Sequence, residues 1–220
     1  MAIILNIDTA VETASVCLAR EAQPLQFAAN GKQKDHASWL HPILQKVMAD
    51  AGLTKKDIEA IAVTIGPGSY TGLRVGLAAV KGLCYALQIP LIAVNTLEMM
   101  AYATSNEEAD LYCPLIDARR MEVFTSVYDK NLTQLIEPKA MIIDPTSFES
   151  MLASNKILFS GNGSEKLKNL INHSNALFSN KVATAADMVD LSERYFRDKK
   201  FGDVAYIEPL YIKEFYSAAR

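Results

Sequence analysis

The chain has 220 residues, half of them hydrophobic, and a formal net charge of −3 at pH 7, so it is long enough for one large or two small globular domains. The acidic balance argues against a protein that grips nucleic acid by itself, because such proteins neutralise phosphates with a surplus of Lys and Arg. Three cysteines without metal-type spacing predict a reducing, cytoplasmic setting, and the short apolar run at the N-terminus predicts no signal peptide. No uninterrupted apolar stretch reaches membrane-spanning length, so no membrane partner is expected.

The first half of the chain predicts a three-stranded meander followed by alternating helices and strands. Residues 2–8 (AIILNID) form an apolar strand that ends on Asp8, and two more short strands follow after a turn. The later elements are expected at 34–51 (helix), 58–65 (strand), 71–88 (helix), 90–94 (strand) and 95–104 (helix).

The second half repeats this plan. The strand LYCPLID ends on Asp117, and two further strands complete a second meander. The rest is expected as a helix (145–154), a strand (156–160), a turn at Gly161 and Gly163, and two helices (163–173 and 184–199). Internal repetition outranks local propensity as a signal. The sequence therefore predicts a duplicated α/β fold with one lobe at 1–107 and the other at 108–220.

The stretch IAVTIGPGSYTGLRVGLAAVKGL (61–83) has the strand, glycine turn and helix of a phosphate-binding loop, but it fits no standard pattern. A Walker loop needs a lysine after its last glycine, and a dinucleotide fingerprint needs a glycine where Thr71 stands. Ser69 is not in a nucleophile elbow, and Ser69 and Thr71 are better explained as caps of the following helix. No catalytic residue is predicted.

Several motifs resemble one known family. The duplicated unit, with an Asp closing each first strand, resembles the actin-like (ribonuclease-H-like) fold of actin, sugar kinases and chaperone ATPases. More narrowly, the chain resembles the TsaB family of bacterial tRNA threonylcarbamoyladenosine biosynthesis proteins, and it departs from it at Ala10 and Lys213. The resemblance rests on ILNIDTA, GPGSYTGLRVGL, AVKGL, IDARRMEVF, SGNGSEK and PLYIK, in that order.

The resemblance implies a cytoplasmic, non-catalytic scaffold subunit. Its partner would be the paralogue TsaD, which transfers a threonylcarbamoyl group to adenosine-37 of tRNA, and the small ATPase TsaE would join them. The subunit would bind and activate TsaD, form a homodimer when alone, and meet tRNA only through the complex. The competing class is an enzyme, a stand-alone actin-like ATPase or small-molecule kinase.

A nucleotide site of the actin-like kind is predicted to be vestigial. Such sites use D-x-G turns, because glycine lets backbone N–H groups approach phosphate. Here Ala10 and Arg119 stand in place of those glycines. No cofactor is predicted, and ATP or ADP at the complex interface stays an open alternative. The candidate residues for a weak or vestigial site are Asp8, Asp117, Arg119, Gly161 and Gly163.

No metal site is predicted. His36 and His41 are five residues apart, roughly 140° around a helix, whereas two ligands on one face need a spacing of three or four. No cysteine or carboxylate completes a set around them.

The helix at 71–88 carries small residues along one edge of an apolar stripe, which favours close packing against another helix. We interpret this edge as a partner surface for TsaD or a second copy. The alternative is that the helix packs only inside its own domain. The predicted partner-binding residues are His36, Trp39, Leu40, Leu44, Gly72, Leu73, Gly76, Leu77, Ala79, Val80 and Leu83.

Overall fold

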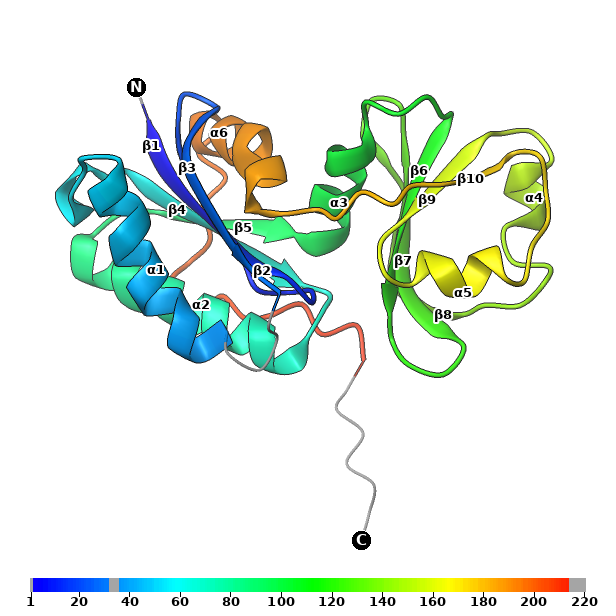
Figure 1. The fold of residues 1–220 in the computed structure, drawn as a ribbon, viewed down its shortest axis with the longest axis horizontal. Coiled ribbons are helices and arrows are strands. Elements are labelled where there is room, and N and C mark those ends of the chain that lie inside the picture. The colour runs from blue at the N-terminus through cyan, green and yellow to red at the C-terminus, as the bar shows by residue number, and fades with distance from the viewer. Residues whose placement is uncertain (1, 32–35, 214–220) are drawn as a thin grey trace, which may run out of the picture.

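The computed structural model describes residues 2–31 and 36–213 as two lobes, each built on a five-stranded sheet (Figure 1). In the first sheet the strand order is β3-β2-β1-β4-β5, with β1 antiparallel to β2 and parallel to β4. These strands are β1 (Ile3–Asp8), β2 (Ala14–Arg20), β3 (Gln23–Asn30), β4 (Ala60–Gly66) and β5 (Leu91–Asn95).

The second sheet has the same plan, with the order β8-β7-β6-β9-β10. Its strands are β6 (Leu111–Asp117), β7 (Glu122–Asp129), β8 (Gln134–Ile142), β9 (Ile157–Ser160) and β10 (Ala176–Phe178). Here too the first strand is antiparallel to the second and parallel to the fourth. Because the two sheets match strand for strand, the predicted duplicated α/β fold is confirmed.

Helices cover both faces of the first sheet. α1 (His36–Asp50) and α2 (Tyr70–Leu87) lie side by side on one face, and α6 (Val189–Arg197) lies on the other (Figure 1). Successive side chains of a strand point to opposite faces of the sheet, so both faces of β1 can be apolar. Leu5 and Ile7 belong to the core under α1 and α2, whereas Ile4 belongs to the core under α6. Within the described ranges, no helix combines the length and the apolar character that crossing a membrane requires.

The two lobes share a continuous core. α3 (Thr96–Thr104) packs against both β5 and β6, and its Met99 and Met100 lie in one hydrophobic cluster with Tyr112 of the second sheet and Leu191 of α6. An apolar interface of this kind holds two lobes in a fixed relative position.

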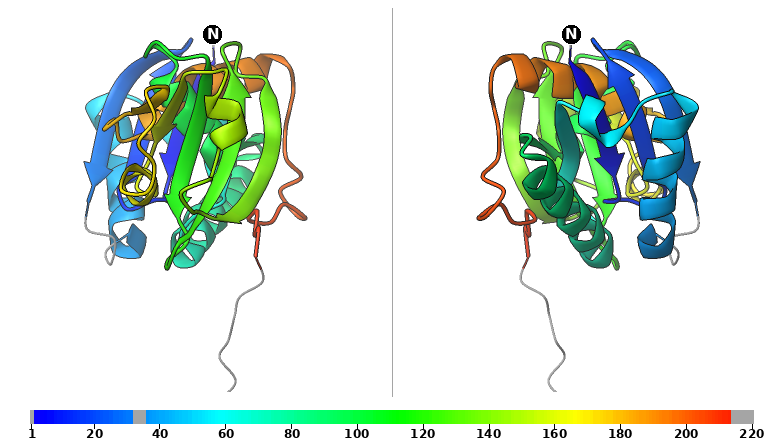
Figure 2. Two further views of the ribbon diagram at one scale, coloured as in Figure 1. Left: turned by 90° about the vertical axis from the view of Figure 1, so that its right-hand side faces the viewer. Right: turned by 90° about the vertical axis from the view of Figure 1, so that its left-hand side faces the viewer.

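The end of the chain returns to the first lobe. The boundary at 107/108 lies between the two sheets, but the predicted second lobe does not extend to the end of the chain. The 3₁₀-helix Ala185–Met188 and α6 pack on the first sheet, and Gly202 pairs with Leu91 at its edge. Lys81 on α2 donates hydrogen bonds to the carbonyl oxygens of residues 205 and 207, both at 3.1 Å. The orange-to-red segment in Figure 2 follows this path along the first lobe. By packing, residues 184–213 belong to the first lobe, although by sequence repetition they belong to the second half.

Two predicted helices are shorter than expected. α4 covers only Glu149–Leu152 and α5 only Ser164–Lys168. Phe148 adopts a left-handed conformation (φ 65°) directly before α4, so the predicted helix cannot begin earlier. The sequence analysis did not predict β10, because a strand of three residues is too short to show an alternation of apolar and polar side chains.

Candidate functional site

The glycines of the loop between β4 and α2 serve close packing inside the first lobe. A Cβ atom on Gly72 would lie 2.0 Å from the carbonyl oxygen of Thr9, and one on Gly68 would lie 2.3 Å from that of Ala10. Thr9 also donates its hydroxyl to the Gly72 carbonyl oxygen at 2.7 Å, while Ser69 caps α2 by accepting from the Gly72 N–H at 3.3 Å. The loop therefore holds the β1–β2 turn (residues 9–13) against the start of α2.

The predicted small-residue partner edge through Gly72 and Gly76 is wrong. A Cβ on Gly76 would lie 2.3 Å from Thr9 Oγ1, so this glycine also faces the β1–β2 turn. The same correction applies to predicted partner residues whose side chains form the core of the lobe, which are Leu40, Leu44, Leu73, Leu77 and Val80.

The exposed edge of α2 is turned around the helix axis, away from the edge that carries Gly72 and Gly76. Ala78 and Gly82 are exposed, and no atom lies within 4 Å of the place where a Cβ on Gly82 would stand. A groove of about 340 Å³ runs between α1 and α2, lined by His41, Val75, Ala78, Ala79, Gly82 and Leu83. Figure 2 shows the two helices facing outward side by side.

Of the predicted partner residues, Ala79 and Leu83 line this groove. Trp39 on α1 is half-buried and packs against the core of the lobe. The side chain of His36 lies outside the described residues. The sequence analysis missed Ala78 and Gly82, although their spacing of four residues was a signal for a small-residue ridge.

Asp8 ties β1 to β4 through its side chain. The carboxyl is fully buried, and its Oδ1 accepts hydrogen bonds from Thr64 Oγ1 (2.6 Å) and from the Ala10 N–H (2.9 Å). Its Oδ2 has no hydrogen-bond partner among the described residues. Burial raises the pKa of Asp8 to about 6, against the lowering effect of the two hydrogen bonds. The residue is therefore a structural acid at the base of the β1–β2 turn.

This raised pKa predicts a pH-dependent difference between wild type and Asp8→Asn. Because the folded-state pKa lies above the unfolded one, the contribution of Asp8 is fully present below about pH 4 and is lost as the pH rises through about 6. A shift of this size corresponds to roughly 3 kcal/mol at most. We expect the free energy of unfolding of wild type to fall relative to Asp8→Asn between pH 4 and 7. Urea unfolding across that range measures it, and a constant difference would contradict the assignment.

Asp117 and the turn after β6 form a second, exposed cluster. Asp117 Oδ1 accepts from the Arg119 N–H (2.6 Å) and from the Lys166 ammonium. Partial burial raises the pKa of Asp117, but these two hydrogen bonds and the positive charges of Lys166 and Arg119 together outweigh it, so the pKa lies below its ordinary value. The carboxylate thus already has a cationic partner from within the chain.

The predicted glycine turn also serves packing. A Cβ on Gly161 would lie 2.5 Å from the Leu115 carbonyl oxygen, and one on Gly163 would lie 3.0 Å from the same oxygen. Both glycines therefore let this turn lie against β6. This packing accounts for both glycines without a ligand, and their place in a weak or vestigial nucleotide site stays a prediction.

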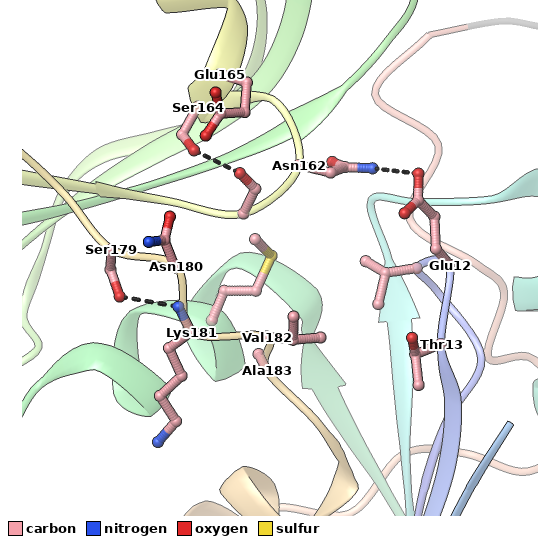
Figure 3. Close-up of a pocket in the computed structure, with 13 residues that line it drawn as sticks. Glu12, Thr13, Asn162, Ser164, Glu165, Ser179, Asn180, Lys181, Val182 and Ala183 are labelled. Atoms are coloured by element: carbon pink, nitrogen blue, oxygen red, sulfur yellow. Dashed lines mark hydrogen bonds between the residues drawn. The ribbon is translucent and has the colours of Figure 1, made fainter. Parts of the chain in front are cut away.

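The pocket between the lobes, about 250 Å³ in volume, is crossed by a polar bridge (Figure 3). Asn162 donates to Glu12 Oε1 at 3.3 Å, and its own Oδ1 accepts from the Asp117 N–H at 2.9 Å. Glu12 and Glu165 place carboxylates on the wall of the pocket. Carboxylates oppose a phosphate, which needs donors and cations. Lys181 lines the same pocket, but its ammonium already pairs with Asp187.

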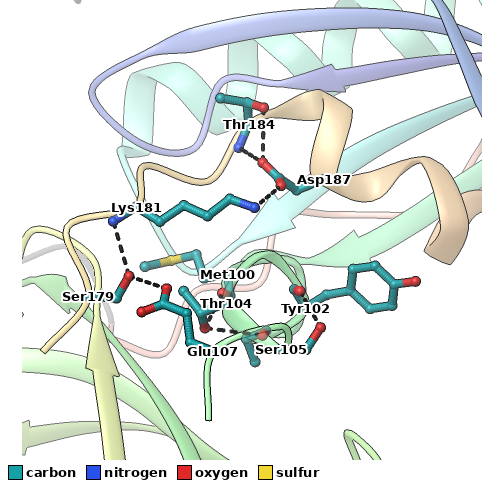
Figure 4. A network of polar contacts seen from close by, with 10 residues as sticks. Met100, Tyr102, Thr104, Ser105, Glu107, Ser179, Lys181, Thr184 and Asp187 are labelled. Carbon is teal, nitrogen blue, oxygen red and sulfur yellow. Dashed lines mark hydrogen bonds and ion pairs between the residues drawn. The ribbon is translucent and has the colours of Figure 1, made fainter. Parts of the chain in front are cut away.

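A polar network fixes the wall of this pocket to the turn after α3 and to the 3₁₀-helix Ala185–Met188 (Figure 4). Ser179 donates to Glu107 at 2.5 Å and accepts from the Lys181 N–H at 3.1 Å. Lys181 also pairs with Asp187 at 2.9 Å, and Asp187 accepts from both the N–H and the hydroxyl of Thr184. The crossing segment from the second lobe to α6 is thus held at several points.

In residues 2–31 and 36–213, no three His, Cys, Asp or Glu side chains lie close enough together to hold a metal ion. The prediction about His36 stays outside this statement, because its side chain is not described.

Comparisons with known proteins agree with the fold and indicate the family. Residues 30–207 match the family model described as TsaD, tRNA N6-adenosine threonylcarbamoyltransferase. The chain is 32% identical over 171 residues to the tRNA threonylcarbamoyladenosine biosynthesis protein TsaB of Bacillus subtilis, covering 76% of this chain and 74% of the relative. It is 28% identical over 218 residues to the Escherichia coli TsaB, covering 96% and 94%.

Two solved structures share the whole architecture. YeaZ from Pseudomonas aeruginosa superposes with a TM-score of 0.83 at 25% identity, covering 96% of this chain and all of that one. An uncharacterized Pseudomonas aeruginosa protein with similarity to peptidase YeaZ gives a TM-score of 0.86 at 24% identity, with 97% and 100% covered. The latter match shows the fold alone.

Proposed function

The chain belongs to the TsaB family of tRNA threonylcarbamoyladenosine biosynthesis proteins, and from this premise we propose that it is a non-catalytic subunit that binds and activates TsaD. The observation that carries the proposal is the acidic lining of the interlobe pocket, where Glu12 and Glu165 place carboxylates. Asn162 and Glu12 bridge the cleft, and the glycines that suggested a phosphate cradle pack against strands and turns. Carboxylates at this position oppose the binding of phosphates, which supports a binding role over nucleotide chemistry.

The outer face of α1 and α2 supports the binding role. A specific interface needs about 800 Å² from each partner and a core depleted in charge. Ala78 and Gly82 allow a second helix to approach closely. The nearest cationic side chains on α2 already form hydrogen bonds within the chain. Lys81 donates to backbone carbonyl oxygens, and Arg74 donates to the Tyr211 hydroxyl at 2.9 Å. The ridge between them is therefore small and uncharged.

The other partners follow from the same proposal. TsaE would join the TsaD complex, an intact tRNA would be held at physiological salt only there, and a homodimer would form through the same α1–α2 face when TsaD is absent. The proposal places all of this in the cytoplasm. It predicts that TsaD and a second copy compete, so that adding TsaD shifts a dimer to a heteromer. Size-exclusion chromatography with and without TsaD tests this, and unchanged elution of both proteins would overturn it.

The competing reading, a stand-alone ATPase or kinase, makes the opposite prediction. We expect the purified chain to hydrolyse no ATP, because the interlobe pocket carries the carboxylates of Glu12 and Glu165 and a bridging Asn162. A coupled phosphate-release assay measures this. Hydrolysis at about 1 s⁻¹ or faster, lost in Asp8→Ala while that variant stays folded, would establish the enzyme instead.

A further inference from the structure

A second groove opens between the lobes beside the N-terminus of α2, and it is separate from the pocket at Glu12. It has a volume of about 530 Å³, within the usual range of ligand sites. The C-terminal segment forms one side of it, because the Leu210 N–H donates to the Ile65 carbonyl oxygen at 2.7 Å and brings the next residues beside the glycine loop. The side chains that line it include Tyr70, Arg74, Arg119, Phe124, Tyr211 and Lys213.

The first-lobe wall is an ordered aromatic and cationic surface. The rings of Tyr70 and Tyr211 lie 5.3 Å apart with an angle of 34° between their planes. The guanidinium carbon of Arg74 stands 4.0 Å from the Tyr70 ring centre, and Arg74 Nε donates to the Tyr211 hydroxyl at 2.9 Å. Tyr211 nevertheless stays 40% exposed. Phe124 lines the groove from the second lobe, so both lobes contribute an aromatic ring.

The groove is also locally basic in a chain whose net charge is −3. Lys213 pairs with Glu122 at 2.6 Å, but within the described part of the chain no carboxylate forms an ion pair with Arg74 or Arg119. Arg119 is exposed and holds a left-handed conformation (φ 70°), which is uncommon for a residue other than glycine. The Asp117 carboxylate fixes this turn by accepting the Arg119 N–H.

We propose that this groove binds a short single-stranded segment of the RNA on which the complex acts. The groove combines the exposed ring of Tyr211 and the half-buried rings of Tyr70 and Phe124 with arginines. Aromatic rings beside arginines are how proteins hold unpaired bases and their phosphates. The inference rests on the proposed function for the identity of the RNA. The position of the groove agrees with this proposal. Arg74 lies one helical turn from Ala78, so a partner bound on the α1–α2 face would border the groove. With at most three cations, the salt dependence would be shallow, with a logarithmic slope of about −2.

A labelled oligonucleotide tests this without TsaD. Fluorescence anisotropy of a fluorescein-labelled five-adenosine RNA, titrated with the full chain at about 50 mM salt, is expected to show saturable binding. Arg119→Ala and Tyr211→Ala should each weaken it about tenfold. Arg197→Ala, which removes an exposed arginine on α6, should leave it unchanged. Thermal melting of each variant confirms that it is folded.

Three results would overturn the proposal. They are no saturable binding at the highest soluble protein concentration, equal binding by all folded variants, and competition by free ADP as effective as by unlabelled RNA, which would make the groove a mononucleotide site. Each can be told apart from a failure of the proposed function. Association with TsaD is absent from this assay, and its loss would not change binding of the oligonucleotide by the chain alone.

Discussion

Replacing Gly72 with alanine is expected to lower the free energy of unfolding by about 3 kcal/mol or more. The new Cβ would lie 2.0 Å from the backbone oxygen of Thr9, a distance that no side-chain rotation relieves. Thr9 is itself fully buried, and its hydroxyl binds the Gly72 carbonyl oxygen. The start of α2 would therefore have to move away from the β1–β2 turn.

Gly82→Ala is the matched control on the same helix. No atom lies within 4 Å of its Cβ position, so the substitution adds no overlap. Alanine is favoured over glycine in a helix by up to about 1 kcal/mol, and this variant should be slightly more stable than wild type. Urea unfolding followed by circular dichroism compares the two. Equal stability of Gly72→Ala and wild type would show that close packing is not why the loop contains glycine.

The second large effect is expected at the proposed partner face. Ala78→Arg places a charge on the exposed ridge of α2, where a docked helix would bury it without a counter-charge. An unpaired buried charge costs about 3 kcal/mol or more, which is roughly a 100-fold loss of affinity for TsaD. Isothermal titration calorimetry with TsaD measures this loss.

Ala153→Arg provides the control for charge and size. Ala153 is also exposed and helical (φ −58°), but it follows α4 in the second lobe, far from α2 (Figure 1). This variant should bind TsaD like wild type. If Ala78→Arg, with an unchanged melting temperature, binds equally well, the α1–α2 face is not where TsaD docks.

The duplicated fold could be predicted because its signals are local and repeated. Each half starts with an apolar strand that ends on an aspartate, Asp8 or Asp117, and the strands of both meanders keep their predicted places. The return of residues 184–213 to the first lobe could not be predicted in this way. It depends on packing between elements far apart in sequence, such as α6 against β1.

The partner surface shows a different limit of sequence patterns. A helix with small residues on two neighbouring edges gives no sign of which edge faces its own sheet. Gly72 and Gly76 were predicted to be outside, but they meet Thr9, while Ala78 and Gly82 are the exposed pair. The distinction depends on where the β1–β2 turn lies, and that turn is about 60 residues earlier in the chain.

The prediction of a vestigial nucleotide site rests on missing glycines after Asp8 and Asp117. The structure adds a contact in the cleft that no local motif contains. Glu12 and Asn162 are 150 residues apart and meet across the cleft at 3.3 Å. The glycines at 161 and 163, which suggested a phosphate turn, instead meet Leu115. Glycine patterns alone do not separate close packing from ligand contact.

The most direct test of the central claim is the rate of threonylcarbamoyl transfer to tRNA by TsaD, measured while the chain is titrated in. We expect the rate to rise with the concentration of the chain and to reach a plateau, and the chain alone to transfer nothing. A transfer rate that stays the same at every concentration of the chain would contradict its role as an activating subunit, whatever it binds.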